Sequence, residues 1–117
     1  MAVSVLIVDD HAGFRTSARR ILEADGFGVV GEAQNGRAGV EEARRLAPDI
    51  VLLDVHLPDG HGFDFADEIA RLPRPPAVVL TSSHDMEDLG DCTHVTSARG
   101  FVPKGDLSGQ AVQALVA

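Results

Sequence analysis

Short apolar runs alternate with amphipathic stretches along the whole chain. The apolar runs are rich in β-branched residues and predict strands at 3–8, 29–33, 50–54, 77–81 and 100–103. Between these runs, apolar residues recur at helical spacing and predict four helices. The first contains residues 14–22 and stops at Gly26, the second is capped by Asn35 and stopped by Pro48, the third contains residues 62–70, and the last starts near Asp106. Because strands alternate with helical segments, the pattern predicts βαβ crossovers and a parallel sheet.

Most of the predicted strands are continuous apolar runs and do not alternate with polar residues. This pattern is typical of a sheet that is covered by helices on both faces. The 117 residues suffice for one domain, residues 1–117, with a core that needs no disulfide or metal. We therefore expect an α/β domain with a five-stranded parallel sheet and helices on both faces.

The segment between the fourth and fifth predicted strands is a poor helix former. Residues 88–96 contain one glycine and three β-branched residues, and each is less favourable than alanine in a helix by about 0.5–1 kcal/mol. We expect the helix in this segment to be short or frayed, and residues 86–97 to be the least ordered part of the domain.

The charge of the chain argues against a polyanionic partner. Asp and Glu number 18 against 10 Lys and Arg, which gives a net charge of −8 without a basic patch. Direct binding to nucleic acid or to an anionic membrane is therefore not expected. The single cysteine, Cys92, cannot form an intrachain disulfide, and the sequence shows neither a secretory signal nor a membrane span. We expect a cytoplasmic domain.

Chemically functional side chains follow the predicted strands at their carboxyl ends. Asp9 and Asp10 follow the first strand, Asp54 ends the third, Thr81 ends the fourth and Lys104 follows the fifth. Open α/β sheets bind their ligands at this edge. Alone, a lysine or threonine here would be an ordinary surface or strand residue, so the interpretation depends on their occurring together.

These motifs resemble those of the response regulator receiver domains of two-component signalling. Residues 8–10 resemble the acidic pair of that family, and residues 53–62 resemble its phosphoacceptor segment. Thr81, Phe101 and Lys104 stand where the family keeps a hydroxyl, a switch aromatic and a lysine. The five motifs occur in order over nearly the whole chain. The resemblance implies a flavodoxin-like (βα)5 fold with strand order 2-1-3-4-5.

The resemblance implies a phosphorylation site that depends on Mg²⁺. Asp54 would be the phosphoacceptor. The metal would be held by Asp10 directly, by Asp9 through water, by Asp54 and by the backbone carbonyl of His56. His11, which follows the acidic pair, is expected at the rim of this site.

The resemblance also implies a switch and a signalling partner. Lys104 and Thr81 would bind the phosphoryl group, and Thr81 and Phe101 would move together to change the surface of helix 4, strand 5 and helix 5. The expected partner is a sensor histidine kinase or a phosphotransfer protein, and a homodimer stays open. No enzyme activity is implied beyond the domain's own phosphorylation and dephosphorylation. The motifs are most similar to those of receivers that precede a helix-turn-helix domain.

Three other functions compete with this one. A pseudo-receiver, which binds partners without being phosphorylated, would typically lack an acid or the lysine. A phosphatase of the haloacid-dehalogenase type would need a second acid two residues after its nucleophile, and Asp9 and Asp10 are followed at that spacing by His11 and Ala12. A structural zinc site is not favoured, because the five histidines show no i, i+4 pair.

Overall fold

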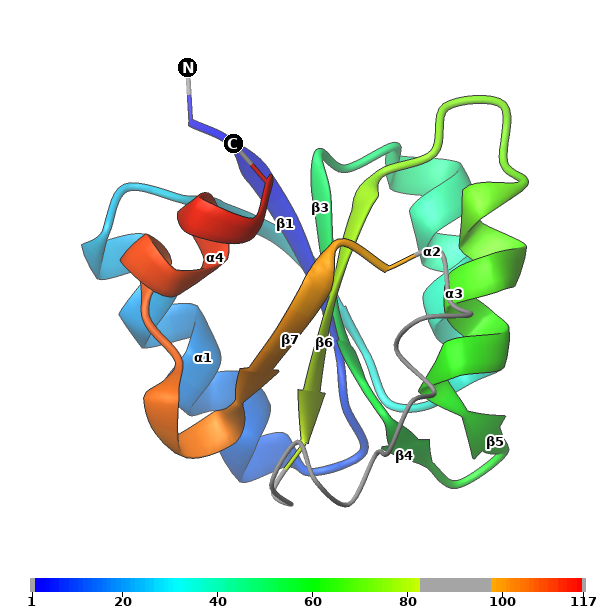
Figure 1. The fold of residues 1–117 in the computed structure, drawn as a ribbon, viewed down its shortest axis with the longest axis horizontal. Helices are drawn as coiled ribbons and strands as arrows, with labels where there is room; N and C mark the ends of the chain where they lie inside the picture. Colours follow the sequence, from blue (N-terminus) through cyan, green and yellow to red (C-terminus); the bar gives the residue numbers. More distant parts are fainter. Residues whose placement is uncertain (1, 83–97, 117) are drawn as a thin grey trace.

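The computed structural model describes residues 2–82 and 98–116. A five-stranded parallel sheet has the order β2-β1-β3-β6-β7, and a two-stranded antiparallel sheet is formed by β4 and β5 (Figure 1). The strands are β1 Ser4–Val8, β2 Gly28–Ala33, β3 Ile50–Asp54, β4 His56–Leu57, β5 Gly60–His61, β6 Ala77–Ser82 and β7 Gly100–Pro103. The helices are α1 Ala12–Ala24, α2 Gly36–Leu46, α3 Gly62–Ala70 and α4 Gly109–Val116.

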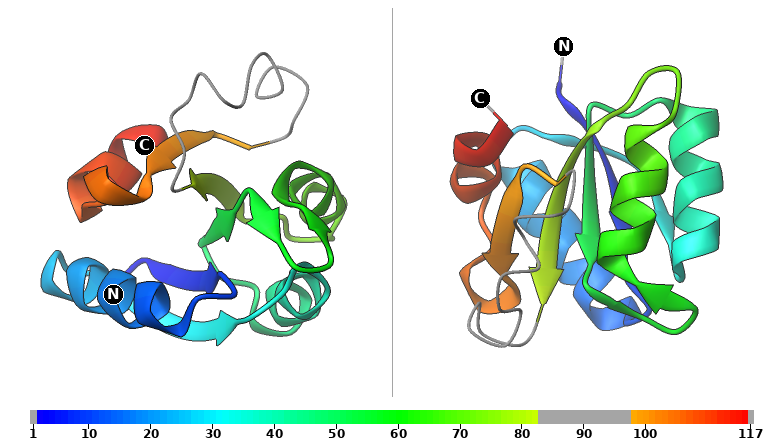
Figure 2. Two further views of the ribbon diagram at one scale, coloured as in Figure 1. Left: turned by 90° about the horizontal axis from the view of Figure 1, so that it is seen from below. Right: turned by 45° about the vertical axis from the view of Figure 1, so that its right-hand side comes forward.

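Helices cover both faces of the sheet, as the apolar strands predict. Figures 1 and 2 show α1 and α4 on one face and α2 and α3 on the other. The core accordingly has two parts, which meet at the central strands. Leu6 and Leu53 belong to the part under α2 and α3, whereas Ile7 and Leu52 belong to the part under α1 and α4. Successive residues of one strand thus serve opposite faces. The predicted fold class and strand order are confirmed.

Helix α2 shows how local signals set the ends of an element. The Asn35 side chain accepts a hydrogen bond from the Ala38 backbone N–H at 2.8 Å and caps the first turn. The helix ends at Leu46, followed by Ala47 in the left-handed region with φ 46° and then by Pro48. Both boundaries agree with the cap and stop expected from the sequence.

The last helix begins later than the sequence predicts. Residues Lys104–Asp106 form a 3₁₀ turn, and α4 begins only at Gly109. The Ser108 hydroxyl accepts a hydrogen bond from the Ala111 backbone N–H at 3.0 Å, which is the capping interaction of a helix start. The start expected near Asp106 is therefore wrong by one turn, because Ser108 and not Asp106 caps the helix.

Two segments of the chain carry less sequence signal than the others. The β4–β5 hairpin was not predicted, because two-residue strands carry no periodicity. The helix expected between the fourth and fifth predicted strands, and the low order expected for residues 86–97, lie outside the described residues. Within the parts of the chain that are described, no helix combines the length and apolar character needed to cross a bilayer.

Candidate functional site

Three aspartates meet at the carboxyl edge of the sheet, which lies at the bottom of Figure 1. Asp9 and Asp10 directly follow β1, and Asp54 is the last residue of the neighbouring strand β3. The Asp9 backbone N–H donates to the Ala33 carbonyl of β2 at 3.0 Å, so the sheet ladder fixes the start of the loop. Because β1 and β3 are adjacent and parallel, their terminal carboxylates are brought together.

Lys104 directly follows β7, the edge strand of the sheet, and its side chain extends to this group. Its Nζ lies 2.7 Å from Asp9 Oδ2 and 3.3 Å from Asp54 Oδ2. The side chains of Asp9 and Asp54 are 0% and 5% exposed and that of Lys104 is 15% exposed, so these charges are largely removed from water. Lys104 Nζ also lies 4.6 Å from the centroid of the Phe14 ring of α1, within cation–π range.

The other oxygens of the two buried carboxylates face backbone donors. Asp9 Oδ1 accepts from the His11 backbone N–H at 2.8 Å, and Asp54 Oδ1 accepts from the His56 backbone N–H at 3.1 Å. Asp10 is more exposed, at 36% of its side chain. Asp9 Oδ2 is buried, and Lys104 is its ion partner.

The electrostatics of the cluster raise the pKa of both Asp54 and Lys104. The pKa of Asp54 is raised by burial first and by the charge of Asp9 second, against the opposing hydrogen bond from His56 and charge of Lys104. The pKa of Lys104 is also raised: burial acts to lower it, but the hydrogen bond and charge of Asp9 and the charge of Asp54 outweigh burial. Two acids therefore compete for one ammonium.

Thr81 and Phe101 complete the set of residues expected from the sequence. Thr81 pairs in register with Asp54 across β3 and β6, and it is 1% exposed. Its Oγ1 is buried without a hydrogen-bond partner among the described residues. Phe101 is 9% exposed and packs in the core part under α2 and α3. In this structure the aromatic ring therefore lies inward.

The segment that contains His56 is anchored to α2. The Asp59 carboxylate accepts hydrogen bonds from the Gly36 and Arg37 backbone N–H groups at 2.8 and 2.9 Å, at the start of the helix. Gly62 closes the segment: its N–H donates to the Val55 carbonyl at 2.7 Å, and a Cβ there would clash with the Asp54 carbonyl. The loop after the candidate phosphoacceptor is thus held at both ends.

The donor set fits a hard divalent cation. Ligand atoms of Asp9, Asp10, His11 and Asp54 all lie within 4.8 Å of one another. Three of these four residues offer carboxylate oxygens, which Mg²⁺ prefers. Thr81 Oγ1, a buried polar atom that has no hydrogen-bond partner among the described residues, belongs to this same edge of the sheet. Unsatisfied buried polar atoms are uncommon in proteins and indicate that the cluster is built for a ligand.

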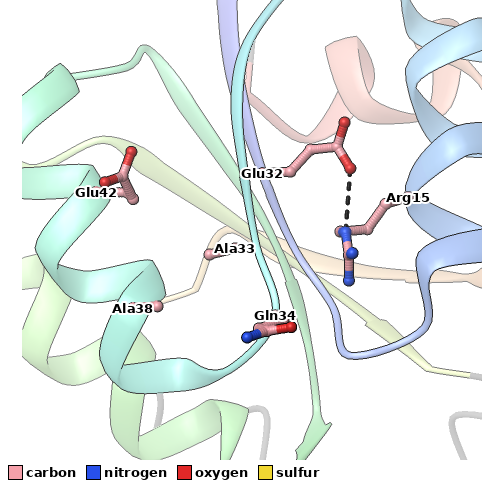
Figure 3. A pocket seen from close by; sticks show the side chains of 6 residues that line it. All are labelled: Arg15, Glu32, Ala33, Gln34, Ala38 and Glu42. Carbon is pink, nitrogen blue, oxygen red and sulfur yellow. Dashed lines mark hydrogen bonds and ion pairs between the residues drawn. The ribbon is translucent and has the colours of Figure 1, made fainter.

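A hollow of about 360 Å³ lies beside the cluster, between the start of α1, the end of β2 and α2. Figure 3 shows Arg15 paired with Glu32 on one side of the hollow, and the distance from Arg15 Nε to Glu32 Oε1 is 3.1 Å. The same guanidinium donates to the Asp9 backbone carbonyl at 2.6 Å. The hollow holds none of the clustered acids, so we assign Arg15 the role of supporting the loop that carries them.

The structure brings together the residues that the sequence singles out, and it adds others. Asp9, Asp54 and Lys104 are in direct contact. Sequence reasoning missed the contacts of Phe14, Arg15 and Asp59, although an aspartate directly after Leu57-Pro58 is a signal for a turn or a cap. The roles of the site residues stay predictions, because geometry alone does not test them.

Comparison with known proteins assigns the family. The model of the response regulator receiver domain matches residues 5–115. Chemotaxis protein CheY of Thermotoga maritima is 33% identical over 98% of this chain and 96% of its own length. Response regulator UvrY of Escherichia coli is 34% identical over 97% of this chain but only 52% of its own length. Several other relatives are likewise longer, and the chain spans 30% to 53% of them.

A solved structure extends the comparison to the fold. The signal receiver domain of the putative response regulator NarL from Mycobacterium tuberculosis superposes with a TM-score of 0.88 at 32% identity, over 98% of this chain and 96% of that one. The match covers both core halves and the edge that carries the acids and the lysine. On the fold, the motifs and these matches, the chain belongs to the response regulator receiver domain family.

Proposed function

We propose that this domain accepts a phosphoryl group on Asp54 in a reaction that requires Mg²⁺. The observation that carries the proposal is the pair of contacts that Lys104 makes with Asp9 and Asp54 at the carboxyl edge of the sheet. The transferred phosphoryl group carries spread negative charge, so its site must supply positive charge. The Lys104 ammonium and a cation held by the neighbouring acids would supply it beside Asp54. Family membership supports the same function.

The transfer step is a substitution at phosphorus. An Asp54 oxygen forms the new P–O bond, and the P–N bond of a phosphohistidine donor breaks, with imidazole as the leaving group. Asp10, Asp54, the His56 carbonyl and, through water, Asp9 would hold the cation, which neutralises phosphoryl oxygens when bound. Lys104 supplies a fixed positive charge on the other side of Asp54, and the Thr81 hydroxyl is the neighbouring donor.

The same site gives the domain a two-state readout. The Thr81 hydroxyl lacks a partner among the described residues and would gain one in the phosphoryl oxygens. Its movement would change the packing around Phe101, which is already buried. The surface that includes β7 and α4 would then report the phosphorylation state to a partner. The donor is a sensor histidine kinase or a phosphotransfer protein, and the output is protein–protein recognition.

The experiment is phosphorylation by a small donor, followed by intact mass. Incubation with acetyl phosphate and Mg²⁺ should add one phosphoryl group to the wild type and none to Asp54→Ala. The matched control is Asp64→Ala, which removes an exposed aspartate on α3 and should be labelled like the wild type. EDTA should prevent labelling of all three proteins.

Other outcomes would replace the proposal. Labelling of Asp54→Ala equal to that of the wild type would assign the phosphoryl group to another residue. A wild type that stays unlabelled at saturating Mg²⁺ would favour a pseudo-receiver, which binds partners without phosphorylation. Steady hydrolysis of a phosphate monoester, which lacks the reactive acyl phosphate or P–N bond of a phosphodonor, would instead indicate a phosphatase.

A further inference from the structure

The His11 ring folds back over the acidic pair. His11 is the residue before α1, but its side chain makes no capping hydrogen bond to that helix. Instead, Nδ1 lies 3.2 Å from Asp9 Oδ1 and 3.2 Å from Asp10 Oδ1. Its backbone N–H also donates to Asp9 Oδ1. One ring nitrogen is therefore equidistant from oxygens of two different carboxylates.

The spacing of these three atoms is that of neighbouring metal ligands. In an octahedral site with bonds of about 2.1 Å, adjacent ligand atoms are separated by about 3.0 Å. His11 Nδ1 meets this spacing with Oδ1 of Asp10, the acid that would hold the cation directly, and it falls in the same group of ligand atoms as Asp54, all within 4.8 Å of one another. Asp9 Oδ2 is the oxygen that faces Lys104, so the ring nitrogen and the ammonium approach different oxygens of one carboxylate.

The nitrogen changes the class of cation that suits the site. Oxygen ligands alone favour Mg²⁺, whereas imidazole nitrogen suits Zn²⁺, Ni²⁺ and other borderline cations. Mg²⁺ also dehydrates reluctantly, so it gains little from an added nitrogen. A histidine next to the acids therefore acts on cation choice more than on cation binding in general.

We propose that His11 is a nitrogen ligand of the cation site and gives this domain an added preference for borderline divalent cations over Mg²⁺. The inference rests on the proposed function for the location of the cation. An independent indication that the cluster takes a ligand is the buried Thr81 hydroxyl, which has no partner among the described residues. The domain would then respond to the supply of such cations as well as to its phosphodonor.

The test compares two cations in three proteins. The full chain without an affinity tag is stripped of metal, and Ni²⁺ and Mg²⁺ binding is measured by isothermal titration calorimetry at one fixed pH. In His11→Ala, the loss of Ni²⁺ affinity should exceed the loss of Mg²⁺ affinity by about tenfold or more. The matched control is His61→Ala, which removes an exposed histidine near His56, their ring centroids being 6.4 Å apart. It should keep the wild-type ratio of affinities.

A spectroscopic measurement separates ligation from support of the loop. In a long-range ¹H–¹⁵N spectrum of the histidine rings, stoichiometric Zn²⁺ should shift the Nδ1 resonance of His11, and Mg²⁺ should not. In Asp10→Ala the Zn²⁺ shift should weaken, because the neighbouring ligand is gone. A residue that only supports the backbone would give no such nitrogen-specific shift.

Several results would overturn the inference. Equal losses of Ni²⁺ and Mg²⁺ affinity in His11→Ala would show that His11 only supports the loop. Loss of the preference in His61→Ala would assign the nitrogen ligand to the hairpin. A wild type that is labelled by acetyl phosphate with Mg²⁺ but shows neither a His11-dependent Ni²⁺ preference nor a Zn²⁺ shift would refute the inference alone. A wild type that binds no Mg²⁺ and is not labelled would refute the proposed function as well.

Discussion

Two sets of charged side chains in this domain lie in different surroundings. Asp9, Asp54 and Lys104 form one buried group at the carboxyl edge of the sheet, with side chains at most 15% exposed. On the surface of α2, by contrast, the pairs Arg44–Glu41 and Arg45–Glu42 have side chains that are 31% to 67% exposed. The surface pairs are as short, at 3.3 and 2.6 Å, as the buried ones at 2.7 and 3.3 Å.

Distance is therefore not what separates these interactions. An exposed pair keeps most of its hydration, so forming or losing it changes the free energy of unfolding little. A buried group has given up that hydration, and removing one partner leaves a charge without compensation. The buried group also has two acids and only one ammonium. A bound cation would offset the excess negative charge. We expect the free energy of unfolding to depend on the buried group and its cation, and to change little when a surface pair is removed.

The largest expected effect follows from removing the only ammonium of the buried group. Lys104→Met keeps the length of the side chain but leaves Asp9 and Asp54 without their shared partner. In the absence of Mg²⁺ the free energy of unfolding should fall by about 3 kcal/mol at neutral pH. Urea unfolding followed by circular dichroism measures this loss, and saturating Mg²⁺ should restore part of it.

The pH dependence identifies the cause of that loss. The charge and hydrogen bond of Lys104 hold the pKa of Asp54 below the level that burial and Asp9 alone would set. Without Lys104 the pKa of folded Asp54 rises further, so the folded variant takes up a proton more readily as the pH falls. The difference from the wild type should therefore shrink between neutral and acidic pH. A loss that is independent of pH would indicate lost packing on Phe14 instead.

A smaller effect of opposite sign is expected when one acid is neutralised. Burial and the charge of Asp9 raise the pKa of Asp54, so the folded state binds the proton more tightly than the unfolded chain does. This contribution favours folding at low pH and is lost as the pH rises through the unfolded and then the folded value. At neutral pH, Asp54→Asn should therefore stabilise the metal-free domain by about 1 kcal/mol, or roughly 4 °C in melting temperature.

The matched comparison for this variant is Asp10→Asn. Asp10 is more exposed than Asp54, so the same change of charge should raise the melting temperature less. Saturating Mg²⁺ should shrink or reverse the gain of Asp54→Asn, because only the wild type keeps its full set of oxygen ligands. An Asp54→Asn domain that melts below the wild type in EDTA would show that Lys104 fully compensates both acids.

The buried group was predictable from the sequence because it stands on strong elements. Residues 50–54 are an uninterrupted apolar run that ends in an acid, and the structure buries every residue of β3. Parallel order then brings the ends of β1 and β3 together without further information. The side chains that the sequence places at one edge, Asp9, Asp54 and Lys104, do meet there.

The partners of the residues that support this group were not predictable. Asp59 caps α2 from 23 positions away, and Arg15 reaches the carbonyl of Asp9 while it pairs with Glu32 of β2. Such contacts depend on side-chain direction after folding, which neither periodicity nor motif spacing contains. The position of the His11 ring beside both acids also depends on side-chain direction. The sequence places it at the rim, but only the geometry shows one nitrogen equidistant from two carboxylates.

The hydrogen bonds of Asp59 to the start of α2 should contribute more to stability than a surface ion pair and less than the buried group. Asp59 lies on the surface, but its carboxylate satisfies two backbone N–H groups at the start of α2. Asp59→Ala should lower the free energy of unfolding by about 1 kcal/mol, and Asp59→Asn, which keeps one acceptor oxygen, by less. Chemical denaturation of both variants provides the measurement. An Asp59→Ala domain as stable as the wild type would mean that water replaces this cap without loss.

The pH dependence of this contact also has a defined sign. Burial acts to raise the pKa of Asp59, but hydrogen bonds from the Arg37 and Gly36 backbones hold it below its usual value. The contribution of Asp59 is thus present above the unfolded value and is lost as the pH falls through the folded value. The wild type and Asp59→Ala should therefore converge in stability only under strongly acidic conditions.

The smallest effect is expected at the surface of α2, at the shortest of its ion pairs. Arg45 lies 2.6 Å from Glu42, and its side chain is 67% exposed. The hydrogen bond between the two side chains raises the pKa of Arg45 and lowers the pKa of Glu42, so the small contribution of the pair is lost as the pH falls through the folded value of Glu42. Water and salt screen the pair, and holding two long side chains together costs conformational entropy. Arg45→Ala should therefore change the melting temperature by less than about 2 °C, and by less again in high salt.

Calorimetry of the single variants and of Arg45→Ala combined with Glu42→Ala gives the coupling between the two side chains, free of their separate helix propensities. A coupling as large as the effect of Lys104→Met would contradict the contrast drawn between buried and exposed charges, because distance and not burial would then set the strength of an ion pair in this domain.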